Sequence, residues 1–447
     1  MSLPTYPGYK DSGVDWLGTV PEHWDSKRLK FLFDLVKREI REEDRIVTCF
    51  RDGAVTLRDN RRTDGFTNAV KEIGYQGIRV GDLVIHAMDA FAGAIGVSDS
   101  DGKSTPVYSV CTPVSPSVSS NYYARLLRNM AVAGFVSSLA KGIRERSTDF
   151  RWADAGEIFL PVPSETEQRK IVSFLDHETA RIDALIEEQQ RLIELLKEKR
   201  QAVISHTVTK GLDPTVPMKD SGVEWLGEVP AHWEVSRLKY HSTRIGDGLH
   251  STPEYDDAGD YFFINGNNLV GGAITISPTT RQVNRQEFLK HRVLLDSSTI
   301  LISINGTIGN LALYSGEPVI LGKSAAYINC TESLSPRFCL YLFSSEQIKR
   351  FFESQLTGTT IYNLSLRTIA EIPTPLPSID EQNSIIEFLN RNVDGFDELI
   401  DNAMKLAQLL QERRSALISA AVTGKIDVRG WQPPASASSS ELAEEAA

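Results

Sequence analysis

Two long stretches of the chain carry apolar residues at the spacing of an α-helix. The recurring positions are Ile182, Leu185, Leu192, Leu196 and Val203 in the first stretch and Phe396, Leu399, Leu406, Leu410 and Leu417 in the second, with Gln189 and Ala403 filling one position each. Their intervals predict two long helices, over 161–209 and 375–424, with Ser164 and Ser378 as N-caps. About 36 periodic residues make a rod of about 54 Å, longer than a small domain needs. The two faces therefore favour packing of the helices on each other; the alternative is that each helix covers only its own domain's core.

The segments before these helices, 31–157 and 240–371, share a plan of strands followed by helices. "GDLVIHAM", from Gly81, and "STILISIN", from Ser298, are typical of buried strands, and each leads to a glycine turn. "NYYARLLRNMAVAGFVSSLA" and "PRFCLYLFSSEQIKRFFESQL" have the composition and periodicity of helices. The two segments differ in sequence, so the shared plan predicts two related, mixed α/β domains.

Two motifs occur twice in the same order. "KDSGVDWLGTVPEHWDSKRLK" from Lys10 and "KDSGVEWLGEVPAHWEVSRLK" from Lys219 are identical at 15 of 21 positions, and "PVPSETEQ" from Pro161 returns as "PLPSIDEQ" from Pro375. A whole unit has been duplicated, which predicts pseudo-two-fold symmetry and an α+β fold with two long antiparallel helices. The expected domains are 1–160, the helix 161–209, 210–374, the helix 375–424, and a tail at 425–447 that is disordered at its end.

Composition removes several classes of protein. The 447 residues are 41% hydrophobic and 24% charged, with no apolar run long enough for a membrane span and no secretory leader at the N-terminus. The four cysteines form no CxxC pair, so we expect reduced thiols, no zinc site and a cytoplasmic protein. The formal charge of −11 argues, over the whole chain, against a nucleic-acid-binding protein.

Complete catalytic motifs are missing from the sequence. "GEPVILGKS" places five residues between Gly316 and Gly322, where a phosphate-binding loop needs four, and an apolar run with a proline fills the gap. No N-P-P-aromatic motif of an amino-methyltransferase and no nucleophile elbow occurs. We therefore expect a chain that has no catalytic residues, no bound metal and no cofactor of its own.

The doubled motifs resemble those of one known family, the specificity subunits of type I restriction-modification systems. The resemblance rests on the doubled "KDSGV(D/E)WLG…VP…HW…RLK", the doubled "P(V/L)PS…EQ" and "GDGLHSTPEY" from Gly246, and it covers residues 6–428. It implies a non-catalytic subunit in which each variable segment is a target recognition domain that reads half of a split DNA target. The helices would then set the length of the DNA spacer between the two halves. The resemblance also implies two modification subunits that bind S-adenosylmethionine, two ATP-driven restriction subunits, and Mg on those partners. A structural adaptor that does not bind DNA is the alternative.

The resemblance directs attention to polar loops in the two variable segments. Lys27–Leu160 holds 20 basic and 17 acidic residues, and Val235–Thr374 holds 12 of each, so the negative charge lies elsewhere. Arginine can bind guanine with two hydrogen bonds, and Asn or Thr can contact adenine and thymine. The predicted DNA-contacting residues are Arg51, Arg58, Arg61, Arg62, Lys141, Arg144 and Arg146 in the first segment and His250, Ser251, Thr252, Asn305, Thr307, Thr359, Thr360, Tyr362 and Asn363 in the second. For each one, an ordinary surface or turn role is the alternative.

Four tryptophans lie at equivalent places in the two copies of the longer motif. Trp16 corresponds to Trp225, and Trp24 to Trp233. Their large apolar area suits either the base of the long helices or contact with a partner subunit. The same two roles, partner or interdomain contact, are predicted for the helix leucines Leu185, Leu192, Leu196, Leu399, Leu406 and Leu410.

Overall fold

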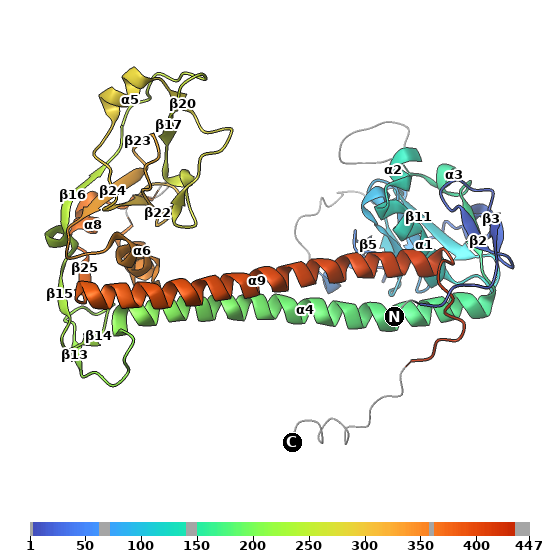
Figure 1. Ribbon diagram of the computed structural model, residues 1–447. Helices are drawn as coiled ribbons and strands as arrows, with labels where there is room; N and C mark the ends of the chain where they lie inside the picture. The colour runs from blue at the N-terminus through green and yellow to red at the C-terminus, as the bar shows by residue number, and fades with distance from the viewer. Residues whose placement is uncertain (1–2, 62–71, 140–149, 357–361, 434–447) are drawn as a thin grey trace. The chain divides into compact units, whose positions relative to one another are not determined.

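The computed structural model describes residues 3–61, 72–139, 150–356 and 362–433, and its contacts divide the chain into two units (Figure 1). Unit 1 consists of residues 1–189 and 406–447, and unit 2 of residues 190–405. The long helices α4 (Glu165–Lys210) and α9 (Ile379–Val422) each pass through both units. The predicted helical ranges begin in short strands, and the helices themselves start four residues later.

The remaining elements of unit 1 precede α4. Its strands are β1 (Tyr9–Asp11), β2 (Thr19–Pro21), β3 (Asp25–Arg28), β4 (Phe33–Leu35), β5 (Val47–Cys49), β6 (Val55–Leu57), β7 (Gln76–Ile78), β8 (Leu83–His86), β9 (Ile95–Val97), β10 (Gly102–Ser104), β11 (Tyr108–Pro113) and β12 (Phe159–Val162). Its short helices are α1 (Ser120–Val132), α2 (Phe135–Leu139) and α3 (Trp152–Ala155).

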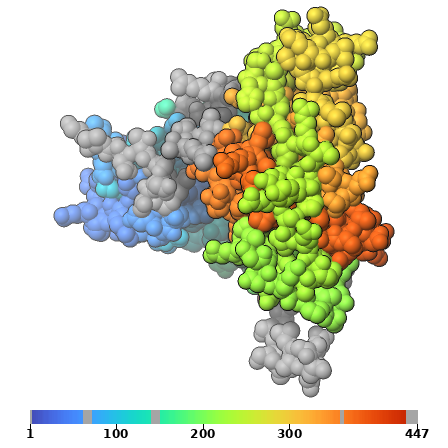
Figure 2. Space-filling model, turned by 90° about the vertical axis from the view of Figure 1, so that its left-hand side faces the viewer, coloured from blue at the N-terminus to red at the C-terminus, as the bar shows by residue number. Residues whose placement is uncertain are grey.

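Unit 2 places its own elements between the two long helices. Its strands are β13 (Met218–Asp220), β14 (Glu228–Pro230), β15 (Glu234–Arg237), β16 (Ser242–Asp247), β17 (Tyr261–Ile264), β18 (Leu269–Val270), β19 (Ala273–Ile274), β20 (Gln282–Val283), β21 (Thr299–Ser303), β22 (Leu311–Leu313), β23 (Val319–Leu321), β24 (Ala325–Cys330) and β25 (Pro373–Leu376). Its helices are α5 (Arg285–His291), α6 (Pro336–Ser344), α7 (Glu346–Gln355) and α8 (Leu366–Ala370). In Figure 2 the green segment that carries β13–β15 lies on the visible surface of this unit.

The central sheets of the two units have the same topology. Unit 1 has the order β4-β11-β8-β9 and unit 2 the order β16-β24-β21-β22, with antiparallel neighbours throughout. The strands predicted from "GDLVIHAM" and "STILISIN" are β8 and β21, which occupy equivalent places. Helices α1 in unit 1 and α6 in unit 2, which lie in stretches predicted to be helical, contact these sheets.

The first repeated motif forms a β-hairpin in each unit. In unit 1, β1 pairs with β2, and the Asp11 carboxylate accepts a hydrogen bond from the Gly13 amide at 3.0 Å. In unit 2, β13 pairs with β14, and Asp220 accepts from Gly222 at 2.9 Å. Gly13 and Gly222 have φ values of +68° and +72°, which favour glycine. The Asp-Ser-Gly sequence is therefore explained by its turn.

The end of that motif is hydrogen-bonded to the start of a long helix. Glu167 Oε1 contacts His23 Nε2 at 2.8 Å and accepts from the Trp24 indole Nε1 at 3.3 Å. In unit 2, Glu381 makes the same two contacts with His232 and Trp233, both at 3.0 Å. The two repeated motifs, distant in sequence, thus form one joint in each unit.

The glutamine that follows each of these glutamates ties the long helix to the neighbouring domain. Gln168 Oε1 accepts from the Ser119 amide at 2.8 Å, where Ser119 is the N-cap of α1. Gln382 accepts from the amide of Ser335, the N-cap of α6, also at 2.8 Å. Because both domains are held by the same bond, Ser119 and Ser335 align α1 with α6 residue by residue.

Trp24 and Trp233 are buried where the ends of the two long helices meet. Trp24 shares a core with Ile171 of α4 and Val422 of α9, and Trp233 shares one with Val208 of α4 and Ile385 of α9. Trp16 and Trp225 are half-buried and lie against Phe135 and Phe351, with ring centroids 5.6 and 5.3 Å apart. All four indoles therefore contact their own unit.

The face through which α4 and α9 contact each other includes the predicted positions Ile182 and Ala403, which are buried, but differs from the prediction at four leucines. Leu185, Leu192, Leu399 and Leu406 are 37%, 41%, 53% and 45% exposed, so they do not form the seam. In unit 2 the contact is made by Ile193, Ile400 and Ala403, with Leu196 packed against them, while Leu410 is half-buried in unit 1. The predicted packing of the helices on each other is correct, and at each of the four exposed leucines the contact is made by the next residue in the chain instead.

Equivalent ion pairs cross between the helices in each unit. Arg414 of α9 contacts Asp183 of α4 through Nε at 2.7 Å and Nη2 at 3.1 Å. In unit 2 the roles are exchanged, and Arg200 of α4 contacts Asp397 of α9 at 2.8 Å. The two arginines are 214 positions apart in the sequence, and so are the two aspartates. The duplication therefore extends to these contacts, which hold the helices antiparallel within each unit.

Three further features of the described residues concern membrane spans, metal ligands and cysteines. No helix among them is long and apolar enough to cross a membrane. In the same ranges, no cluster of three or more His, Cys, Asp or Glu side chains could hold a metal ion. Cys49, Cys111, Cys330 and Cys339 are all free and buried.

Candidate nucleic-acid interface

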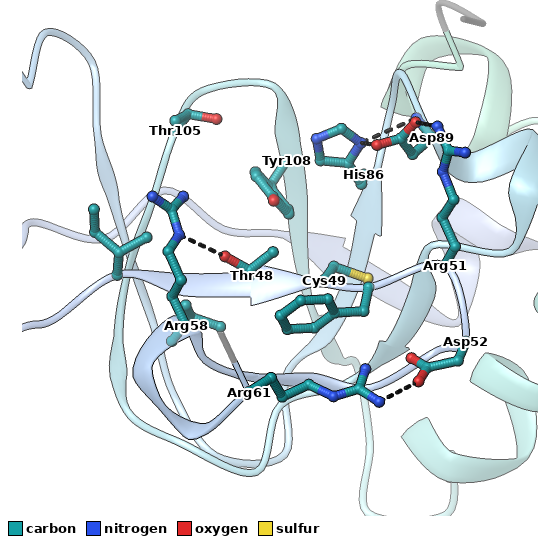
Figure 3. Close-up of a pocket in the computed structure, with 13 residues that line it drawn as sticks. Thr48, Cys49, Arg51, Asp52, Arg58, Arg61, His86, Asp89, Thr105 and Tyr108 are labelled. Carbon is teal, nitrogen blue, oxygen red and sulfur yellow. Dashed lines mark hydrogen bonds and ion pairs between the residues drawn. The ribbon is translucent and has the colours of Figure 1, made fainter. Parts of the chain in front are cut away.

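An open cleft of about 710 Å³ lies at one edge of the central sheet in unit 1 (Figure 3). β8 ends at this edge with His86, and β11 begins there with Tyr108, because these two residues are paired in the antiparallel ladder. The hairpin β5–β6 with the turn that follows it supplies most of the other side chains, and Asp89 and Thr105 come from the segments after β8 and before β11. Arg51, Arg58 and Arg61, three of the predicted DNA-contacting residues, all line this cleft.

Each of the three arginines is held in place by a neighbouring group. Arg51 Nη2 contacts Asp89 at 2.8 Å, and Arg61 Nη2 contacts Asp52 at 2.6 Å and lies over the Phe50 ring. Arg58 Nε donates to the Thr48 hydroxyl at 3.2 Å. Their positions are therefore restricted before any ligand binds, which lowers the entropic cost of forming new hydrogen bonds.

His86 supplies a neutral donor to the cleft. The Asp89 amide donates to His86 Nδ1 at 3.0 Å, so the proton of the neutral ring lies on Nε2. Burial lowers the pKa of His86, and the charge of Arg51 acts in the same direction, although Asp89 opposes both. The Tyr108 ring packs edge-on against the His86 ring, with the ring centroids 4.5 Å apart. The site therefore offers a neutral imidazole N–H beside guanidinium groups.

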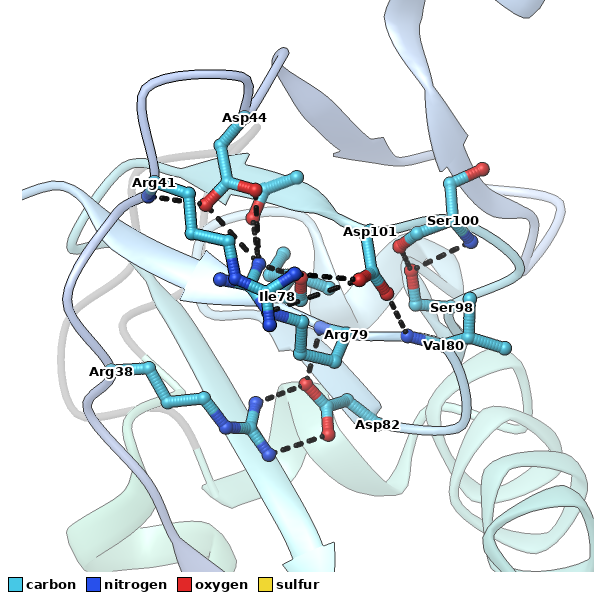
Figure 4. A network of polar contacts seen from close by, with 11 residues as sticks. Arg38, Arg41, Asp44, Ile78, Arg79, Val80, Asp82, Ser98, Ser100 and Asp101 are labelled. Atoms are coloured by element: carbon cyan, nitrogen blue, oxygen red, sulfur yellow. Dashed lines mark hydrogen bonds and ion pairs between the residues drawn. The ribbon is translucent and has the colours of Figure 1, made fainter.

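A second polar network lies at the opposite end of β8, beside Asp82 (Figure 4). Asp82 accepts from Arg38 Nη2 at 3.0 Å and from the Arg79 amide at 2.7 Å, and Arg79 contacts Asp44 at 3.1 Å. Arg41 contacts Asp101 at 3.2 Å. These arginines are paired with carboxylates, of which Asp44 and Asp82 are buried. We therefore assign this network to the stability of the fold.

In unit 2 the candidate residues gather at the equivalent sheet edge. Asp247 at the end of β16 pairs with Ala326, and Ser303 at the end of β21 pairs with Ala325, so both strands end where β24 begins. His250, Ser251 and Thr252 follow β16 and are exposed; Asn305 and Thr307 follow β21; and Tyr362 and Asn363 arrive through a bridge between Asn305 and Asn363. His250 Nε2 contacts Asp247 at 2.8 Å.

Six of the predicted contact residues cannot be placed, and several lining residues were not predicted. Arg62, Lys141, Arg144, Arg146, Thr359 and Thr360 lie outside the described residues. Thr48, His86, Asp89, Thr105 and Tyr108 line the unit 1 cleft but were missed, because they belong to buried strands or a turn without a motif. The alignment of "GDLVIHAM" with "STILISIN" could have identified His86, since it aligns with Ser303, two residues before Asn305.

The fold thus contains two equivalent sheet edges that carry different side chains. A model of the "Type I restriction modification DNA specificity domain" matches residues 230–408. A sequence assigned as the MjaX specificity subunit of Methanocaldococcus jannaschii is 21% identical over 432 residues, covering 92% of this chain and 96% of the relative. The type I restriction enzyme MjaVIII specificity subunit of the same organism is 25% identical over 61% of this chain and 63% of the relative.

Solved structures show the same fold. A chain from a structural study of complex assembly and conformational transition in the type I R-M system aligns with a TM-score of 0.69 and 16% identity, over 91% of this chain and 99% of that chain. The HsdS subunit from Thermoanaerobacter tengcongensis aligns with a TM-score of 0.53 and 15% identity, over 91% and 98%. Over most of its length the chain is thus similar to type I restriction-modification specificity subunits, and residues 230–408 match the model of their DNA specificity domain.

Proposed function

We propose that this chain is the DNA-recognition subunit of a type I restriction-modification complex, and that each unit reads one half of a split DNA target. The observation that carries the proposal is the pair of equivalent sheet edges. Equivalent strands end at this edge in the two units, yet the side chains that they present are different. A repeated scaffold with non-repeated site residues suits two half-sites of different sequence.

The chemistry of the two edges supports different base preferences. The unit 1 cleft presents guanidinium groups and an imidazole N–H, which suit the acceptors O6 and N7 of guanine. The unit 2 edge presents Asn305, Asn363 and hydroxyl groups, which suit the edges of adenine and the methyl group of thymine. Both domains are close to neutral in charge, so their electrostatic affinity for the phosphate backbone is modest.

We further propose that partner subunits supply the catalysis and much of the DNA affinity. Two modification subunits would bind S-adenosylmethionine and methylate adenine, and two restriction subunits would use ATP and Mg. This chain would have neither methyltransferase nor nuclease activity alone. The exposed leucines of α4 and α9, which the helix contact leaves uncovered, are available to a modification subunit, and the continuous helices would set the spacer between half-sites.

An exchange of the first recognition domain tests the proposal. Residues 31–157 are replaced by the corresponding segment of a relative with a different target, and methylated adenines are mapped in a host that carries the modification subunit. We expect one half of the target to change and the other half to stay. The matched control exchanges residues 240–371 and should change the other half only. Methylation that keeps both halves in both hybrids would identify the chain as an adaptor that does not read DNA.

A further inference from the structure

A second cavity in unit 1, of about 380 Å³, lies between α1 and the C-terminal part of α9, behind the turn at Asp52 and Gly53. Three arginines line it: Arg125 and Arg128 from α1 and Arg414 from α9. The other polar side chains in its wall are those of Asp52, Asn121, Asn129 and Ser415. The wall therefore contains three guanidinium groups and a single carboxylate.

Only one of the three arginines lacks a carboxylate partner. Arg125 is paired with Asp176, and Arg414 with Asp183. Asp52, the carboxylate in the wall, is engaged by Arg61 on the side of the DNA cleft. Arg128 forms no ion pair within the ranges that the structure describes; its Nη2 donates to the Arg51 carbonyl at 3.4 Å, and its Nε is buried without an acceptor.

The surroundings of Arg128 make this charge costly. Burial lowers the pKa of the Arg128 guanidinium, and the nearby charge of Arg414 lowers it further. Gly53 permits the close approach, because a Cβ atom at that residue would lie 2.8 Å from the Arg128 side chain. A half-buried cation with an unused donor and a second cation nearby is destabilising unless an anion joins it.

Unit 2 shows that the shared fold does not require these arginines. The N-caps Ser119 and Ser335 align α1 with α6, which places Tyr341 opposite Arg125 and Ser344 opposite Arg128. The hydroxyl of Tyr341 contacts Asn390, as Arg125 contacts Asp176, so the alignment is correct in space as well. Only Arg414 has an arginine counterpart, Arg200. The extra cations in unit 1 therefore serve something other than the duplicated architecture.

We propose that the cavity formed by Arg125, Arg128 and Arg414 binds a phosphate group. Guanidinium groups bind phosphate oxygens with paired, charge-assisted hydrogen bonds, and the Asn121 and Asn129 amides add neutral donors. The phosphate can belong to the DNA backbone, since Asp52 lines both this cavity and the DNA cleft, or it can be a free anion. Phosphate binding itself does not depend on the proposed function; only the DNA source does.

The first test measures thermal stability of the full chain in inorganic phosphate, with chloride at the same ionic strength as the reference. The variant is Arg128→Ser, which copies unit 2 and should therefore fold. The control is Arg350→Ser, which removes an exposed arginine paired with Glu346 on α7. Phosphate at about 20 times its dissociation constant should raise the melting temperature of the wild type and of Arg350→Ser by about 4–7 °C. Arg128→Ser should show no such rise. Equal responses of all three proteins to phosphate and chloride would overturn the proposal.

The second test identifies the source of the phosphate. Binding of a fluorescent DNA duplex is measured against salt concentration for the same three proteins. If the phosphate belongs to DNA, Arg128→Ser should reduce the slope of log K against log salt by about 1, and Arg350→Ser should not. An unchanged slope with a lost response to inorganic phosphate assigns the site to a free anion. If no DNA is bound even when the chain is assembled with its modification subunits, while the response to inorganic phosphate persists, the proposed function is refuted and this site stands.

Discussion

Glu167 lies at the centre of the joint in unit 1, and its removal should destabilise that unit strongly. The substitution Glu167→Ala takes away the acceptor of the buried Trp24 indole and the carboxylate that contacts Ser164 Oγ at 2.9 Å. An indole N–H left without a partner costs about 1–3 kcal/mol, and the lost capping interaction about 1 kcal/mol. The ion pair with His23 adds little, because the histidine side chain is 44% exposed.

These contributions give an expected loss of about 2–4 kcal/mol, or about 5–12 °C in the melting temperature of a unit of this size. The counterpart Glu381→Ala should cost less, about 1–2 kcal/mol, because the Glu381 side chain is 27% exposed against 6% for Glu167, so water can replace it. The matched control is Glu165→Ala, which loses an exposed pair with Arg169 in the same helical turn and should cost under about 1 kcal/mol.

The assay is urea unfolding followed by tryptophan fluorescence, with melting temperature as a second measure. A double-mutant cycle with Trp24→Phe, which removes the N–H donor and keeps an aromatic ring, should show a coupling energy of about 1 kcal/mol with Glu167→Ala. If Glu167→Ala is no more destabilising than Glu165→Ala, or if the coupling is zero, the joint does not contribute the stability that its geometry implies.

Three further predictions address the helix contact, the half-buried tryptophans and acid stability. Ile193→Asp should cost at least about 3 kcal/mol of unfolding free energy, whereas Leu192→Asp, one residue away and exposed, should cost under about 1 kcal/mol; the reverse order would restore the seam predicted from sequence. Trp16→Ala and Trp225→Ala should lower the melting temperature by similar amounts, because each indole is half-buried against one phenylalanine, and a silent substitution at one site alone would contradict their equivalence. Burial raises the pKa of Glu167, but its hydrogen-bond donors outweigh burial and leave the pKa below the ordinary value, so the unfolded chain binds more protons in acid. Its contribution to stability should be complete above about pH 4–5 and be lost as the pH falls through the folded pKa, so Glu167→Gln should flatten the acid limb of stability against pH, and an unchanged limb would count against the assignment.

The repeats made most of the architecture predictable. Two copies of one motif sequence implied two copies of one local structure, and the hairpins at Asp11 and Asp220 and the joints at Glu167 and Glu381 are that structure. What the sequence could not supply was the pairing between motifs. Nothing local indicates that the glutamate of one motif accepts from the tryptophan of the other, because the two are separated by more than 140 residues in the chain.

The four leucines of the helix contact were misplaced for a different physical reason. Leu192 and Ile193 are adjacent and both apolar, so two stripes with helical spacing run side by side along α4. Periodicity detects a stripe but does not decide which of two neighbours faces the other helix. On α9 the seam was predicted correctly at Ala403, but the larger apolar side chain of Leu406 was preferred to that of its buried neighbour Ala407.

The candidate site was predictable where it lies in loops and unpredictable where it lies at strand ends. Arg51, Arg58 and Arg61 stand in one basic segment, and the structure places all three on one cleft. His86 and Tyr108 meet there only because β8 and β11 are paired, which is a property of the sheet. Arg128 was overlooked because helix α1 has the composition of an ordinary amphipathic helix, and its missing carboxylate partner is visible only in three dimensions.

The assignment of residues 406–447 to unit 1 has a consequence for how the protein is made. The core around Trp24 includes Ala421 and Val422, and the amide of Asp427 donates to the carbonyl of Pro4 at 2.7 Å. Unit 2, by contrast, is one uninterrupted segment, 190–405. During translation the ribosome therefore synthesises everything that unit 2 needs before the last part of unit 1. Unit 1 is begun first and completed last, so a premature stop codon between Lys405 and Val422 would remove residues from the core of unit 1 while leaving the sequence of unit 2 whole.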